Sequence, residues 1–142
     1  MELYQTDIYA IISRKSARLK KEQKEGIILI KVNWDVEELV ALIDLYRREQ
    51  RGEIPNLDIE LEKLSAALNQ RAVKLGIQHD EKYRNFNGMK MMYQNVEYIA
   101  TDGRRGMSAA SSSMRKVYSL LSVAPDVFDL ILDEFKTRYD TI

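Results

Sequence analysis

Apolar residues recur three or four positions apart through most of this 142-residue chain, and that spacing favours helices over strands. The clearest stripe lies within residues 57–75 and comprises Leu61, Leu64, Leu68, Ala72 and Leu75. Gly76 follows directly and suits the C-terminus of a helix. Only two prolines and six glycines occur in the chain, so few helix breakers interrupt the pattern. The spacing therefore predicts an all-α fold.

The same spacing predicts about six helices around one core. We expect them over residues 2–24, from about residue 35, over 57–75, over 88–100, after the serine-rich run 108–113, and from Pro125 onward. The apolar run 27–30 is either one short strand or a buried connector, because periodicity does not separate the two. We predict a basic N-terminal helix and connector over 1–32 and a helical domain over 33–142, packed as one unit.

Helix caps are predicted at several positions. Asp35 with Glu38 fits a capping box at the start of the second helix, and Asn33 is a rival cap. Asn85 or Asn87 could cap the fourth helix. Several serines could cap the fifth.

Several classes of protein are disfavoured by what the sequence lacks. No apolar run approaches the ~18 residues of a membrane span, and the N-terminal charge order is wrong for a signal peptide, so we expect a cytoplasmic protein. Cysteine is absent and His79 is the single histidine, which leaves no zinc site. Asp126 and Glu134 resemble the acidic pair of a metal nuclease, but on a helix they lie two turns apart. We expect no enzyme activity, no cofactor and no metal.

Charge is unevenly distributed although the net charge is zero. Residues 14–24 carry six bases and one acid, and residues 71–105 carry seven bases and four acids. Residues 34–64 carry nine acids and four bases, and residues 126–140 carry five acids and two bases. A polyanion responds to such local fields more than to the total.

The stretch 82–98 combines these bases with amide side chains. Arginine, asparagine and glutamine are the residue types that recognise guanine and adenine edges through paired hydrogen bonds. A helix that carries them near its N-terminus is typical of a recognition helix in the major groove. The candidates for DNA contact are Arg84, Asn85, Asn87, Lys90 and Asn95. The alternative is that the asparagines only cap the helix or support it, and that Arg84 is solvated.

The turn 101–106 and the serines after it suit phosphate oxygens. Arg104, Arg105 and Ser108 would supply guanidinium forks and a hydroxyl at the start of a helix. The lysine–serine/threonine ending of a Walker loop is missing. The alternative is a plain turn followed by a helix cap, which needs only one serine.

The ordered set of these motifs resembles a helical domain found at the N-terminus of bacterial HNH-type restriction endonucleases and related defence proteins. The resemblance covers residues 34–118 and rests on Trp34, Glu37, Glu38, the segment LVALIDLY, the segment ELEKLSAALNQ, Tyr83, Arg84, Asn85, Asn87, Gly88, Lys90 and Asn95. Two positions depart from the family pattern: methionine follows the lysine where leucine is common, and Val96 stands where phenylalanine is common. The HNH nuclease itself is absent.

The resemblance implies a helix-turn-helix-like trihelical unit, with Trp34 packed where it begins, that engages double-stranded DNA beside a nuclease or another defence subunit. The expected function is DNA recognition in a bacterial restriction or phage-defence system without catalysis by this chain. The alternative is a helical protein–protein interaction or dimerisation adaptor, in which basic residues 14–24 pack on the acidic 34–64 surface of a second copy.

Overall fold

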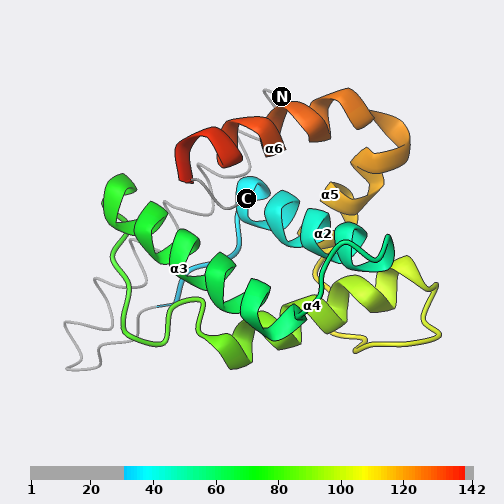
Figure 1. Ribbon diagram of the computed structural model, residues 1–142, viewed down its shortest axis with the longest axis horizontal. Helices are drawn as coiled ribbons and strands as arrows, with labels where there is room; N and C mark the ends of the chain where they lie inside the picture. The colour runs from blue at the N-terminus through cyan, green and yellow to red at the C-terminus, as the bar shows by residue number, and fades with distance from the viewer. Residues whose placement is uncertain (1–30, 140–142) are drawn as a thin grey trace.

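The computed structural model describes residues 31–139, and within them the chain forms five helices and no strand (Figure 1). The helices are α2 (Val36–Gln50), α3 (Leu57–Leu75), α4 (Phe86–Ala100), α5 (Ser112–Val123) and α6 (Pro125–Tyr139). The all-α prediction is therefore confirmed for this part of the chain. The predicted basic helix over 2–24 and the apolar run 27–30 lie outside the described residues.

Local side-chain caps explain where these helices begin. Asp35 and Glu38 form the expected capping box at α2: each side chain accepts a hydrogen bond from the other residue's backbone N–H. Asn56, Asn85 and Ser111 cap α3, α4 and α5 by the same kind of bond. Helix α4 was predicted to begin at residue 88 and begins two residues earlier, at Phe86, because Asn85 rather than Asn87 is its cap.

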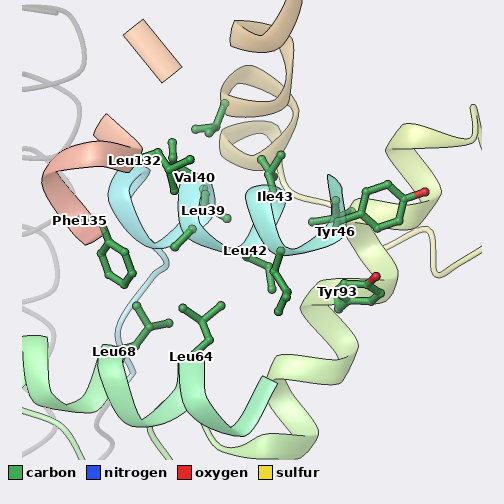
Figure 2. Packing of buried hydrophobic residues seen from close by; sticks show 14 of the residues in the cluster. Leu39, Val40, Leu42, Ile43, Tyr46, Leu64, Leu68, Tyr93, Leu132 and Phe135 are labelled. Atoms are coloured by element: carbon green, nitrogen blue, oxygen red, sulfur yellow. The ribbon is translucent and has the colours of Figure 1, made fainter. Parts of the chain in front are cut away.

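Helix α2 forms the centre of the fold and the other four helices surround it (Figure 1). Every residue from 38 to 46 is buried, as expected for a helix covered on all sides. Figure 2 shows Leu64 and Leu68 of α3 facing α2 from one side, and Leu132 and Phe135 of α6 facing it from the other. The rings of Tyr46 and Tyr93 join α2 to α4, with centroids 5.5 Å apart.

The trihelical helix-turn-helix prediction is not confirmed. Helices α3 and α4 are joined by residues 76–85, a connection longer than the three or four residues of a helix-turn-helix turn. Helix α2 also packs on α5 and α6, so helices α2 to α4 are not a separate unit. None of the described helices is long and apolar enough to cross a membrane.

Candidate nucleic-acid interface

Arg84 lies in the interior, where its guanidinium pairs with a buried carboxylate. Its Nε and Nη2 donate to the two carboxylate oxygens of Glu38, at 2.6 and 2.8 Å. Nη1 donates to the Val32 carbonyl, and Nη2 also donates to the Asn33 carbonyl. Glu38 is 1 % exposed and Arg84 is 8 % exposed. Sequence reasoning placed Arg84 near DNA, but in this arrangement its donors are occupied by the protein itself.

Two aromatic residues complete this buried cluster. The Arg84 guanidinium lies 4.7 Å from the ring centroid of Trp34 and 4.2 Å from that of Tyr83. The Tyr83 hydroxyl donates to Glu38 at 2.9 Å. Burial, and then the negative charge of Glu38, raise the pKa of the Tyr83 phenol above its ordinary value. Arg84 therefore contacts Trp34, Glu38 and Tyr83.

Helix α3 holds the turn that carries Arg84. The Ser65 hydroxyl donates to the Arg84 carbonyl at 2.6 Å, and the Asn69 amide donates to the Tyr83 carbonyl at 3.1 Å. Arg84 adopts a left-handed backbone with φ of 48°, which is uncommon for a residue with a side chain. These contacts fix both the position of Arg84 and the start of α4 immediately after it.

An exposed stripe follows α4 along its outer face. Asn87, Lys90 and Gln94 are spaced by three and four residues, so they project from one side of the helix, and all three are exposed. Lys90 lies 3.8 Å from the Asp58 carboxylate and 5.3 Å from the Phe86 ring, and about half of its side chain remains accessible. The sequence analysis named Asn87 and Lys90 as candidates for DNA contact and did not name Gln94, although its spacing from Lys90 was visible.

The other two asparagines have different environments. Asn85 is exposed, but its side-chain oxygen accepts the Gly88 N–H as the α4 cap. Asn95 is 5 % exposed, on the side of α4 away from solvent, and lines a groove beside Trp34. Neither residue belongs to the exposed stripe.

The turn after α4 presents two arginines on a tightly fixed backbone. The amides of Gly103, Arg104 and Arg105 donate to Tyr98 O, Thr101 O and Thr101 Oγ1, so they are not free to bind phosphate. The side chains of Arg104 and Arg105 are exposed. Ser108 is also exposed but does not cap α5, because Ser111 does.

The close approach of this turn to α4 depends on Gly106. A Cβ at that position would lie 2.2 Å from Gln94 O and 2.7 Å from Tyr98 N, and the residue has a φ of 88°. The amide of the next residue, Met107, donates to Gln94 O at 3.1 Å. The glycine therefore allows the two arginines to be held against the C-terminal end of α4.

Exposed bases and acids are unevenly distributed along the described residues. Between residues 82 and 116 the exposed bases are Lys82, Lys90, Arg104, Arg105, Arg115 and Lys116, and the acids in the same range are Glu97 and Asp102. One further exposed acid, Asp58 of α3, lies 3.8 Å from Lys90. Helix α6 carries four exposed acids, Asp126, Asp129, Asp133 and Glu134. Helices α4 and α6 lie on opposite sides of α2 and do not touch (Figure 1). We call the α4 side, with the α4–α5 turn and the first turn of α5, the basic face.

Three other polar residues considered in the sequence are His79, Asp126 and Glu134, all in the part of the chain that the structure describes. No three or more histidine, aspartate or glutamate side chains gather there to hold a metal ion. His79 is half-buried; its Nδ1 lies 2.8 Å from the Ile77 carbonyl oxygen and its ring packs on Tyr83. Asp126 and Glu134 are exposed on α6.

Comparison with known proteins adds no relative: no protein-family model, no curated protein and no solved structure matches the chain.

Proposed function

We propose that this protein is a double-stranded-DNA recognition module of a bacterial restriction or phage-defence system, acting in the cytoplasm and non-catalytic by itself. The observation that carries the proposal is the basic face, where six exposed bases lie on α4, just before it, in the turn after it and at the start of α5, together with exposed amide side chains on α4. The restriction or defence setting rests on the resemblance of residues 34–118 to the helical domain of HNH-type endonucleases. A separate nuclease or defence subunit would supply cleavage.

The dimensions of α4 suit the major groove. Its 15 residues make a helix of about 22 Å, and the major groove is about 12 Å wide. In our proposal the stripe Asn87, Lys90 and Gln94 faces the base edges. Arg104 and Arg105, just beyond the last turn of α4, contact backbone phosphates, and Lys82 does so near its first turn.

Arg84 has a supporting role in this proposal. Its pairing with Glu38 fixes the turn from which α4 begins, and so sets how the exposed stripe is presented. Asn85 and Asn95 likewise act through the helix rather than through direct contact along the exposed stripe. Ser108 remains a candidate phosphate contact, since its hydroxyl is exposed beside the arginines.

The test is fluorescence anisotropy with mixed-sequence duplex DNA and alanine variants. Replacing Lys90, Arg104 or Arg105 should weaken binding. Arg104→Ala and Arg105→Ala should each make the dependence of log affinity on log salt less steep by about 0.9, the value for one lost phosphate contact. Arg138→Ala is the matched control, because that exposed base lies on the acidic helix α6. Equal losses for Arg138→Ala and for the basic-face variants would overturn the assignment of the surface.

A second candidate is the protein-interaction adaptor. It is favoured by exposed apolar side chains outside the basic face, among them Val123 at 78 % and Leu130 at 57 % exposure, near the junction of α5 and α6. Light scattering on the free protein distinguishes the two. A stable dimer that dissociates on Val123→Ser or Leu130→Ser, together with no DNA binding, would favour the adaptor.

A further inference from the structure

A groove opens between the buried Arg84 cluster and α4. It has a volume of about 290 Å³, near the lower end of small-molecule pockets, which span about 300–1,000 Å³. Its lining comes from three segments that the fold brings together: Trp34 before α2; Lys82, Arg84 and Asn85 before α4; and Gly88, Met91, Met92 and Asn95 on α4. The groove is distinct from the exposed stripe, although Met91 borders both.

Asn95 gives this groove an unused hydrogen-bonding group. The residue is 5 % exposed, and its Oδ1 is buried without a hydrogen-bond partner. Its Nδ2 has only a weak contact, 3.8 Å from the Met92 sulfur. Buried amides normally have good partners, so an amide left in this state calls for a ligand that supplies them. A ligand edge with a donor beside an acceptor would satisfy both ends of the carboxamide.

The other walls favour a flat apolar ring. Trp34 is half-buried, with the Arg84 guanidinium against its ring, and it lines the groove together with Met91 and Met92. Aromatic and thioether groups pack well against a planar π system. Lys82, exposed at the rim, adds a positive charge near the opening. The groove therefore combines an amide that can bind a polar edge, aromatic and thioether side chains that can pack on a ring, and a cation that can pair with an attached phosphate.

We infer that this groove holds one unstacked nucleobase of the bound DNA strand. A nucleobase has the required donor and acceptor on one edge, and asparagine pairs with such an edge in known DNA complexes. Proteins that hold an unstacked base do so by hydrogen bonds to its edge and by packing against aromatic and apolar side chains. The inference rests on the proposed DNA binding and adds a substrate class: duplexes with a mismatched, bulged or otherwise easily unstacked base.

The chain carries its own probe, because Trp34 is the only tryptophan. The full chain is titrated with a duplex containing one unpaired central adenine and with the same duplex fully paired, while anisotropy and Trp34 emission are followed together. We expect the bulged duplex to bind roughly tenfold more tightly and to quench Trp34 more strongly, since an unpaired base costs less to unstack.

Two variants and a control locate the effect. Asn95→Leu removes an amide without a partner, so it should fold at least as well as the parent while losing the preference for the bulged duplex. Met91→Ala changes a side chain that is 52 % exposed and should reduce the preference without unfolding the protein. Met107→Ala, at 40 % exposure and outside the groove lining, should leave the preference unchanged.

The outcomes separate this inference from the proposed function. Binding of both duplexes with equal affinity and unchanged Trp34 emission would overturn the inference and leave DNA binding intact. No anisotropy change with either duplex would overturn the proposed function. In that case, quenching of Trp34 by free adenosine monophosphate would still support a nucleobase groove. No quenching by adenosine monophosphate would reject both the proposed function and the nucleobase groove. Trp34 emission that depends on protein concentration without DNA would show a second copy in the groove and overturn the inference.

Discussion

Removing the Arg84 guanidinium should destabilise the fold far more than removing a surface charge. Arg84→Met keeps an unbranched side chain but leaves the Glu38 carboxylate buried without its cationic partner. It removes two hydrogen bonds to Glu38 and two to the carbonyls of Val32 and Asn33. Breaking one side of a buried ion pair costs about 3–5 kcal/mol. Domains of this kind have a total stability of about 5–15 kcal/mol, so the loss is a large part of it.

Urea unfolding followed by far-UV circular dichroism and Trp34 emission measures this loss. Lys82→Met is the matched control, because that nearby base is exposed and should change the free energy of unfolding by less than about 0.5 kcal/mol. The double variant Glu38→Leu/Arg84→Met removes both charges, but also the acceptor of the Asp35 N–H and of the Tyr83 hydroxyl. It should therefore lose less stability than the sum of the two single variants, and the difference measures the coupling between the two sites. An Arg84→Met midpoint equal to that of Lys82→Met would refute the buried-pair reasoning.

Further predictions concern the turn after α4 and the start of α2. Gly106→Ala should destabilise the protein by more than about 2 kcal/mol, because its Cβ would meet the Gln94 carbonyl oxygen at 2.2 Å. Gly52→Ala is the control, because Gly52 also has a positive φ, 75°, but an added Cβ there would have no atom within 4 Å. It should cost only the strain of a left-handed backbone, about 1–2 kcal/mol. Similar urea midpoints for the two variants would reject the contact argument. Burial, and then the charge of Glu38, raise the pKa of Asp35 above 3.8. A raised pKa means that the folded protein binds the Asp35 proton more tightly than the unfolded chain does. The stability gained from this proton is therefore fully present below pH 3.8 and is lost as the pH rises through the pKa of Asp35 in the folded protein. Asp35→Asn keeps a good helix cap but has no carboxyl group to titrate. Its stability should therefore increase relative to that of the parent as the pH rises from about 4 to 7. A difference in urea midpoint between the two proteins that does not change with pH would contradict this.

The parts of the fold set by local sequence were predicted well. Helix α3 covers the residues predicted for it, because its leucine stripe and the left-handed Gly76 are local signals. The capping box of Asp35 and Glu38 is likewise encoded three residues apart. The trihelical unit was not confirmed, because the sequence does not reveal that α2 is enclosed on every side by four helices.

The environment of the site residues depends on contacts between distant segments. Arg84 meets Glu38 across 46 positions of sequence, so no local pattern distinguishes it from the exposed arginines of the next turn. Both Asn85 and Asn87 could cap α4, and only the observed hydrogen bond from Gly88 decides between them. The exposed stripe was partly visible, since helical spacing placed Lys90 and Gln94 off the core face. The groove could not be predicted from the sequence, because Trp34 and Asn95, which both line it, lie 61 positions apart in the chain.

Salt-dependent binding of the unmodified protein to duplex DNA tests the central claim most directly. Anisotropy is measured with methylated and unmethylated mixed-sequence duplexes at about 50 and 200 mM salt, with magnesium absent. The basic face predicts binding at low salt that weakens steeply at high salt, by roughly a thousandfold if about six phosphates are contacted. Binding that is absent at low salt, or that does not change with salt, would contradict the assignment of this face to DNA.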